Sequence, residues 1–200
     1  HDIVIEDLVV DGNKENNGAL DGNYAGGLWF QDCHSLQFRR IVSRNNNSDG
    51  ISFQICHDVI VEACHSHDNA GLGIHPGSGS QRPLMRNNRL ERNDIGLFFC
   101  WGVKYGLAEN NVCLDNGTGI SIGHRDDENL VRKNEVRGSR GAGLLFRPER
   151  GAGYTATGNR IEKNVLVDNG AADGPAVDIQ GGTAGNVLAQ NEIRETRGPA

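Results

Sequence analysis

Short stretches of alternating apolar and polar residues recur along this chain, and no stretch carries the apolar stripe of an amphipathic helix. In "GISFQ", which begins at Gly50, the pattern predicts Ile51 and Phe53 inward and Ser52 and Gln54 outward. The segments "GLWFQ", "GLFFC", "GISIG" and "GLLFR" repeat the alternation. A period of two residues is typical of β-strands, because successive side chains point to opposite faces. The pattern therefore predicts an all-β protein.

These stretches return at a nearly constant interval. A small residue precedes each one, at Gly27, Gly50, Gly73, Gly96, Gly119, Gly143 and Ala176, with gaps of 23, 23, 23, 23, 24 and 33 residues. A second column consists of Asn88, Asn111, Asn134, Asn164 and Asn191. Two columns that share a period indicate a solenoid of stacked coils, each built from three short strands. We expect the asparagines to form a hydrogen-bonded ladder at one turn of the coils.

The chain, from "HDIVIEDLVVDGN" to "NEIRETRG", resembles the right-handed parallel β-helix proteins of the pectate-lyase-like superfamily. The resemblance implies a single domain over residues 1–200, with three parallel sheets and about seven or eight coils. It also implies a polysaccharide partner and a location in the extracellular space, the periplasm or the cell surface. Because the superfamily includes lyases, hydrolases, epimerases, tailspikes and adhesins, it indicates the fold more firmly than the activity. Both ends stop in mid-coil, which predicts part of a longer chain, or ends through which copies stack into an oligomer.

Composition narrows the partners further. The net charge of −6 argues against nucleic acid, whose phosphates require a basic face. No apolar run approaches the roughly 18–20 residues of a membrane span. Five cysteines cannot all pair within the chain. Cys33 and Cys56 occupy equivalent positions one repeat apart, and we expect them to stack as free thiols rather than form a disulfide.

One outward face differs from a solvated surface of lysine and glutamate. Its columns, read from the repeat, contain aromatic, amide and basic side chains, and long insertions before Trp29 and after Phe146 flank it. Aromatic rings stack on sugars, and amides and arginine bind hydroxyl or carboxylate groups. The face therefore predicts a groove for an extended polysaccharide. The alternative is that its aromatic side chains pack under an insertion loop. The predicted substrate-binding residues are Trp29, Gln31, Gln54, Phe98, Trp101, His124 and Arg147.

The predicted catalytic residues belong to the same region. His75 lies at the centre of one column, and histidine exchanges protons near neutral pH. Asp49 and Asp68 lie at turns near it and are the predicted acid or base partners. The motif "NSDG" around Asp49 is similar to a polygalacturonase motif, but the paired aspartates that should follow are absent, and Ala70 and Gly71 stand there instead. We predict no metal or other cofactor, because no acidic cluster is dense enough to place a Ca²⁺ ion.

Three functions fit this pattern. The first is a glycoside hydrolase or polysaccharide lyase that uses His75 with Asp49 or Asp68, while Arg147 and Trp29 hold the substrate. The second is a non-catalytic module for glycan binding, adhesion or cell-surface scaffolding. The third is an inactive part of a solenoid whose chemistry lies in other coils. His75 among aromatic coils favours the first function, and the missing acid pair favours the other two.

Overall fold

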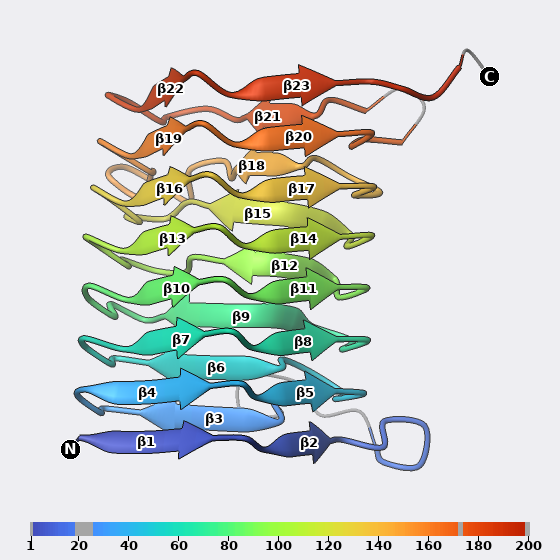
Figure 1. The fold of residues 1–200 in the computed structure, drawn as a ribbon. Coiled ribbons are helices and arrows are strands. Elements are labelled where there is room, and N and C mark those ends of the chain that lie inside the picture. Colours follow the sequence, from blue (N-terminus) through green and yellow to red (C-terminus); the bar gives the residue numbers. More distant parts are fainter. Residues whose placement is uncertain (1, 19–25, 172–173, 199–200) are drawn as a thin grey trace.

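The protein forms a solenoid of three parallel β-sheets, seen in a computed structural model that describes residues 2–18, 26–171 and 174–198. Each full coil contributes one short strand to each sheet, so neighbours within a sheet come from successive coils (Figure 1). No helix occurs in these residues, and hence none that could cross a membrane. The predicted all-β parallel solenoid is confirmed.

Sheets A and B each contain eight strands. Sheet A is formed by β1 (Ile3–Glu6), β4 (Leu36–Arg39), β7 (Ile60–Glu62), β10 (Leu84–Arg86), β13 (Leu107–Glu109), β16 (Leu130–Arg132), β19 (Arg160–Glu162) and β22 (Val187–Ala189). Sheet B is formed by β2 (Val9–Asp11), β5 (Val42–Arg44), β8 (His65–His67), β11 (Arg89–Glu91), β14 (Val112–Leu114), β17 (Glu135–Arg137), β20 (Val165–Val167) and β23 (Glu192–Arg194).

Sheet C contains seven strands and carries the stretches that define the repeat. They are β3 (Leu28–Gln31), β6 (Ile51–Gln54), β9 (Leu72–Gly77), β12 (Ile95–Phe98), β15 (Thr118–Ile122), β18 (Leu144–Phe146) and β21 (Val177–Ile179). The register follows the predicted columns, since Trp29 is opposite Ser52, and Ser52 is opposite His75. Sheets of eight, eight and seven strands also agree with the predicted seven or eight coils.

A narrow apolar core runs between the sheets, and asparagine ladders close its corners. Phe38, Phe53 and Phe146 are fully buried in it. The predicted ladder is present, because the side chain of each member donates to the next, as from Asn88 to Asn111 at 2.9 Å. The structure adds ladders that we did not predict. One links Asn46, Asn69, Asn93 and Asn116, and another links Asn129, Asn159 and Asn186.

All five cysteines carry free thiols, as expected for Cys33 and Cys56. Burial raises the pKa of Cys56 and Cys64 to about 11 and that of Cys100 and Cys113 to about 12. Only Cys33 is partly exposed. Because the thiolate is the reactive form, we expect an aromatic disulfide reagent at about pH 8 to modify Cys33 quickly and the other four only after unfolding in urea. Peptide mapping by mass spectrometry checks this, and fast labelling of a second thiol in the native protein would contradict it.

Apolar side chains are exposed at both ends of the described solenoid. At one end these are Ile3, Val4, Leu8 and Val9, and at the other Ile179, Val187, Leu188 and Ile193. The outer strands β1 and β22 each have one strand neighbour in sheet A. Association of copies through these ends stays a prediction.

Candidate functional site

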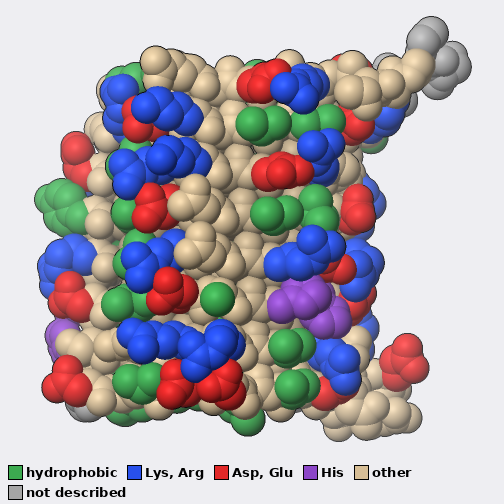
Figure 2. Space-filling model, in the orientation of Figure 1, with side chains coloured by type: hydrophobic (Ala, Val, Ile, Leu, Met, Phe, Trp, Pro, Cys, Tyr) green, Lys and Arg blue, Asp and Glu red, His purple; other side chains and the backbone are tan. Residues whose placement is uncertain are grey.

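We place the candidate site on sheet C, because charged side chains in ion pairs are frequent on the other two faces. Basic and acidic side chains form columns over sheets A and B, with apolar side chains and a group of histidines between them (Figure 2). Many of them pair between neighbouring coils, as Arg86 does with Glu62 at 2.8 Å and Arg132 with Glu109 at 2.8 Å. Exposed pairs of this kind keep a surface solvated and contribute little free energy.

The outward face of sheet C is more closed than we predicted. His75 is only 1% exposed, Gln54 4% and Arg147 9%. The prediction of an open groove with an exposed histidine is therefore wrong for this part of the face. The reason is that long side chains lie flat along the sheet instead of standing out from it. Two glycines leave the room for this, because a Cβ on Gly77 would stand 2.3 Å from Oε1 of Gln54, and one on Gly123 would stand 2.8 Å from Cβ of Arg147.

A buried aspartate–histidine pair lies at the centre of this face. Asp49 directly precedes the Gly50–Ile51 turn into β6, and His75 lies one coil later in β9. Oδ2 of Asp49 is 2.7 Å from Nδ1 of His75, and its Oδ1 accepts a hydrogen bond from the Leu72 backbone at 3.0 Å. Ser52 Oγ lies 3.4 Å from the same imidazole nitrogen.

The Asp49 contact involves only Nδ1 of His75, so the second ring nitrogen, Nε2, is not used by the pair. Nε2 of His75 is buried and has no hydrogen-bond partner within the described residues. A carboxylate at Nδ1 favours the tautomer that carries its proton there, so that Nε2 presents a lone pair. An oriented imidazole of this kind is equipped to remove or return a proton. Burial of an unpaired nitrogen also costs about 1–3 kcal/mol, which a ligand hydrogen bond would offset.

Arg147 places a cation on the same face. It follows β18, and its guanidinium donates to Ser121 Oγ at 2.7 Å, to the Phe99 carbonyl at 2.7 Å and to Asp126 Oδ2 at 3.1 Å. Burial lowers the pKa of Arg147, and the nearby Asp126 opposes that shift. Its Nε has no partner in the described part of the chain.

Phe98 joins the arginine to the histidine. Cζ of Arg147 lies 4.1 Å from the centre of the Phe98 ring, and the Phe98 and His75 rings meet in a T-shaped contact with 5.3 Å between centroids. The imidazole and the guanidinium thus share one aromatic neighbour. The arrangement places a proton acceptor and a fixed cation around one aromatic ring.

Asp126 accepts a hydrogen bond from Arg147. The segment "GHRDDEN" that contains it was a weak candidate for catalysis in the sequence, but this contact was not predicted. Backbone N–H groups of Gly102, Val103 and Gly123 donate to its carboxylate at 2.9–3.0 Å. Burial raises the pKa of Asp126 to about 7, whereas Arg147 and the backbone donors favour its charged form. Asp126 and Arg147 are about one repeat apart in the sequence, so they lie on neighbouring coils. Whether their side chains meet depends on the side-chain conformations, which the repeat does not predict.

The other predicted residues lie around this centre or away from it. Trp29 is partly buried on β3, whereas Gln31 is exposed on the same strand. Trp101 is exposed and meets His124 at 5.2 Å between ring centroids. Burial lowers the pKa of His124, as does the nearby Arg147.

Asp68 is the predicted catalytic residue that the structure does not join to His75. Its carboxylate instead accepts from Arg92 Nε at 2.7 Å and contacts Nδ1 of His67. The hydrogen bond from Arg92 holds the pKa of Asp68 well below its usual range. The corner after sheet B therefore uses this carboxylate in a surface ion pair.

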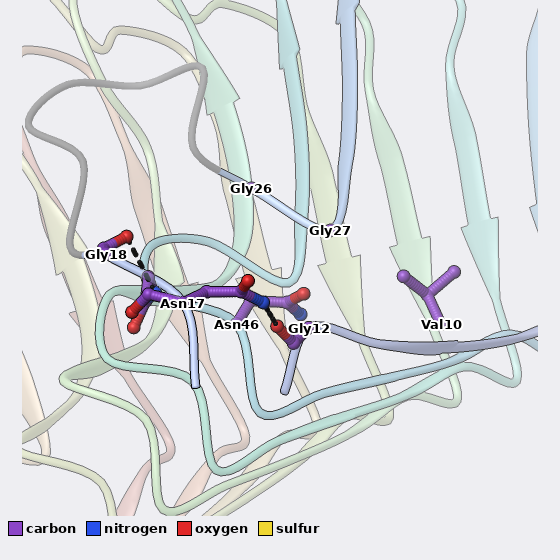
Figure 3. Close-up of a pocket in the computed structure, with 8 residues that line it drawn as sticks. Val10, Gly12, Asn17, Gly18, Gly26, Gly27 and Asn46 are labelled. Carbon is purple, nitrogen blue, oxygen red and sulfur yellow. Dashed lines mark hydrogen bonds between the residues drawn. The ribbon is translucent and has the colours of Figure 1, made fainter. Parts of the chain in front are cut away.

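One hollow lies away from this centre. It has a volume of about 480 Å³ and is bordered by Val10, Gly12, Asn17, Gly18, Gly26, Gly27, Asn46 and Asn47 (Figure 3). None of these residues has a titratable side chain. The rest of the first insertion, residues 19–25, lies outside the described residues. Elsewhere in the described chain, no three His, Cys, Asp or Glu side chains are arranged to hold a metal ion.

Comparison with known proteins identifies the family. Residues 6–151, well over half of the chain, match the family described as "Right handed beta helix region". The chain belongs to the right-handed β-helix family. The predicted handedness of this β-helix is thereby confirmed. No curated protein sequence matches it.

Solved structures resemble this β-helix at low sequence identity. A mutant of the periplasmic alginate epimerase AlgG is 16% identical, with a TM-score of 0.61 over 80% of this chain and 34% of that chain. An alginate lyase from Paenibacillus sp. str. FPU-7 is 15% identical, with a TM-score of 0.52 over 93% and 79%. ORF18 of Geobacillus virus E2 is 14% identical, with a TM-score of 0.53 over 95% and 41%. These likenesses show the fold, and this β-helix spans about a third of the epimerase.

Proposed function

We propose that this β-helix acts on a uronate-containing polysaccharide by moving a proton at the carbon next to the sugar carboxylate. The observation that carries the proposal is the Asp49–His75 pair, with its unpartnered Nε2, beside the buried cation of Arg147. His75 Nε2 would take the proton, and Arg147 would stabilise the negative charge that develops on the carboxylate. The similar structures named as an alginate epimerase and an alginate lyase support the same substrate class.

The arrangement favours proton abstraction over glycoside hydrolysis. Hydrolysis uses two carboxyl groups on either side of the bond, about 5–9.5 Å apart. Asp49 is occupied by His75, Asp68 by Arg92, and Asp94 is exposed in the part of the chain described. After proton abstraction, departure of the neighbouring glycosidic oxygen, which takes up a proton from water, completes an elimination. Delivery of a proton by water on the face opposite His75 completes an epimerisation. The description of one similar structure as periplasmic supports a place of action outside the cytoplasm.

The second candidate is a glycan-binding module without turnover, and the burial of His75 favours it. Substrate can reach Nε2 only if a covering side chain moves. We assign this role to Gln54, because its Oε1 has no partner within the described residues and lies against Gly77, where a Cβ would stand 2.3 Å away. Gln54 donates from Nε2 to Ser52 Oγ at 3.1 Å in the closed arrangement.

A panel of polymers in deuterium oxide tests the proposal. Alginate and polygalacturonate, with xylan as the neutral control, would be incubated with the protein and followed by ultraviolet absorbance of unsaturated uronate and by NMR for deuterium next to the carboxylate. We expect either deuterium next to the carboxylate of a uronate polymer, if the proton is replaced, or ultraviolet absorbance, if elimination follows. New reducing ends without either signal would replace the proposal with hydrolysis. Retardation in an alginate gel without any reaction would replace it with binding alone.

A further inference from the structure

A cluster of aromatic and basic side chains lies at the corner where the chain leaves sheet C. We call it the aromatic corner, and its members are Trp101, His124, Arg125, Arg150 and Tyr154. The Trp101 ring meets His124 at 5.2 Å and Tyr154 at 5.7 Å between centroids. Arg150 Cζ lies 5.5 Å from the centre of the Trp101 ring, and Arg125 Cζ lies 5.4 Å from that of Tyr154.

The aromatic corner has the properties of a surface made for a ligand. Trp101 is 41% exposed, although transfer of an indole from water to a protein interior lowers the free energy. The left-handed backbone of Trp101 belongs to the repeat, because Ile55 and Ser78 adopt it at the same corner of earlier coils. What sets Trp101 apart is an exposed indole that contacts aromatic and basic side chains from two other segments.

Unpaired polar groups surround the ring. Most arginines of the described chain pair with a carboxylate, but Arg125 and Arg150 do not, and neither do Arg39 and Arg140. His124 is 8% exposed, and its Nδ1 is buried without a hydrogen-bond partner in the described residues. Two arginines without a carboxylate partner and an imidazole with one unsatisfied nitrogen, beside an exposed indole, match the carboxylate, hydroxyls and apolar ring face of a uronic acid.

We propose that the aromatic corner is a subsite for an anionic sugar residue of the polymer that reacts at His75. The proposal rests on the proposed function for the identity of that polymer. Trp101 follows Phe98 by three residues, which places it about 10 Å along the coil from Phe98, the neighbour of His75, by the rise of a strand. A short oligosaccharide spans this separation. A sugar stacked on Trp101 would give its carboxylate to Arg150 or Arg125 and a hydroxyl to His124.

The test compares short and long substrates in matched variants. Trp101→Ala removes the platform. Tyr105→Ala is the control, because Tyr105 is 60% exposed at φ 57° on the same coil and belongs to no such cluster. We expect Trp101→Ala to lower kcat/KM on uronate hexamers about tenfold while leaving uronate dimers unchanged, since the corner contacts only the longer chain. Tyr105→Ala should change neither, and Arg150→Gln should weaken hexamer binding and reduce its dependence on salt.

The outcomes separate the subsite from the proposed function. Equal effects of Trp101→Ala on dimers and hexamers, or no effect on either, would overturn the subsite and leave the function of His75 standing. Retardation in an alginate gel that needs Trp101, in a protein with no turnover on any polymer, would overturn the proposed function and support the subsite. Retardation by xylan gels that equals retardation by alginate would overturn the anionic specificity.

Discussion

Replacing His75 with alanine is expected to lower kcat on a uronate polymer by about a thousandfold, because a positioned general base contributes about 10²- to 10⁴-fold. KM should change little, since the proposed mechanism has the imidazole act on the reacting proton and leaves the binding of the sugar to Arg147 and the aromatic side chains. The measurement is the initial rate of deuterium incorporation or of unsaturated uronate formation at saturating polymer. Retention of more than a tenth of wild-type kcat would contradict the role of His75.

Two further variants separate chemistry from folding in that experiment. His75→Gln keeps a polar side chain beside Asp49, so that the buried carboxylate retains a neighbour, yet it supplies no base. His57→Ala removes another histidine one coil earlier, whose ring packs against His34 at 4.9 Å rather than beside Asp49. We expect His75→Gln to be as inactive as His75→Ala, and His57→Ala to keep wild-type kcat. All three should show wild-type circular dichroism.

The largest effect on stability is expected at the middle of the predicted ladder. The Asn111 side chain accepts hydrogen bonds from the backbone and side chain of Asn88, at 3.1 and 2.9 Å, and donates to Met85 O at 3.0 Å and to Asn134 Oδ1 at 2.9 Å. Asn111→Ala leaves several buried groups unpaired at about 1–3 kcal/mol each. Partial relaxation of the coils reduces the sum, so we expect the free energy of unfolding to fall by about 3 kcal/mol.

Urea unfolding checks this value, provided that the slope with denaturant is the same in both proteins. The matched control is Asn110→Gly, because Asn110 is exposed and its φ of 54° suits glycine. That control should change the free energy of unfolding by less than about 0.5 kcal/mol. A loss below 1 kcal/mol for Asn111→Ala, close to the control, would show that the ladder is not a major source of stability.

Part of the candidate site followed from counting residues. The repeat placed Ser52, His75 and Phe98 in one outward column, and it placed Arg147 on the same face. The repeat does not predict the conformations of these side chains in the stacked coils. Asp49 was one of two carboxylates proposed for His75, and the repeat gave no reason to prefer it to Asp68. The structure decides between them: Asp49 contacts His75 at the corner that leads into sheet C, whereas Asp68 pairs with Arg92.

The sequence by itself determined the solenoid, because each coil contacts only its neighbours and the glycine and asparagine columns repeat at that same interval. It also determined which side chains of each strand face the core, because a shift of the pairing by one residue would turn the apolar side chains outward. Only the tertiary structure decided that the outward face closes over His75, that Gly77 and Gly123 leave room for Gln54 and Arg147, and that Asp126 anchors Arg147. These contacts join residues on different coils through side-chain conformations, and packing on the neighbouring coil selects the conformation.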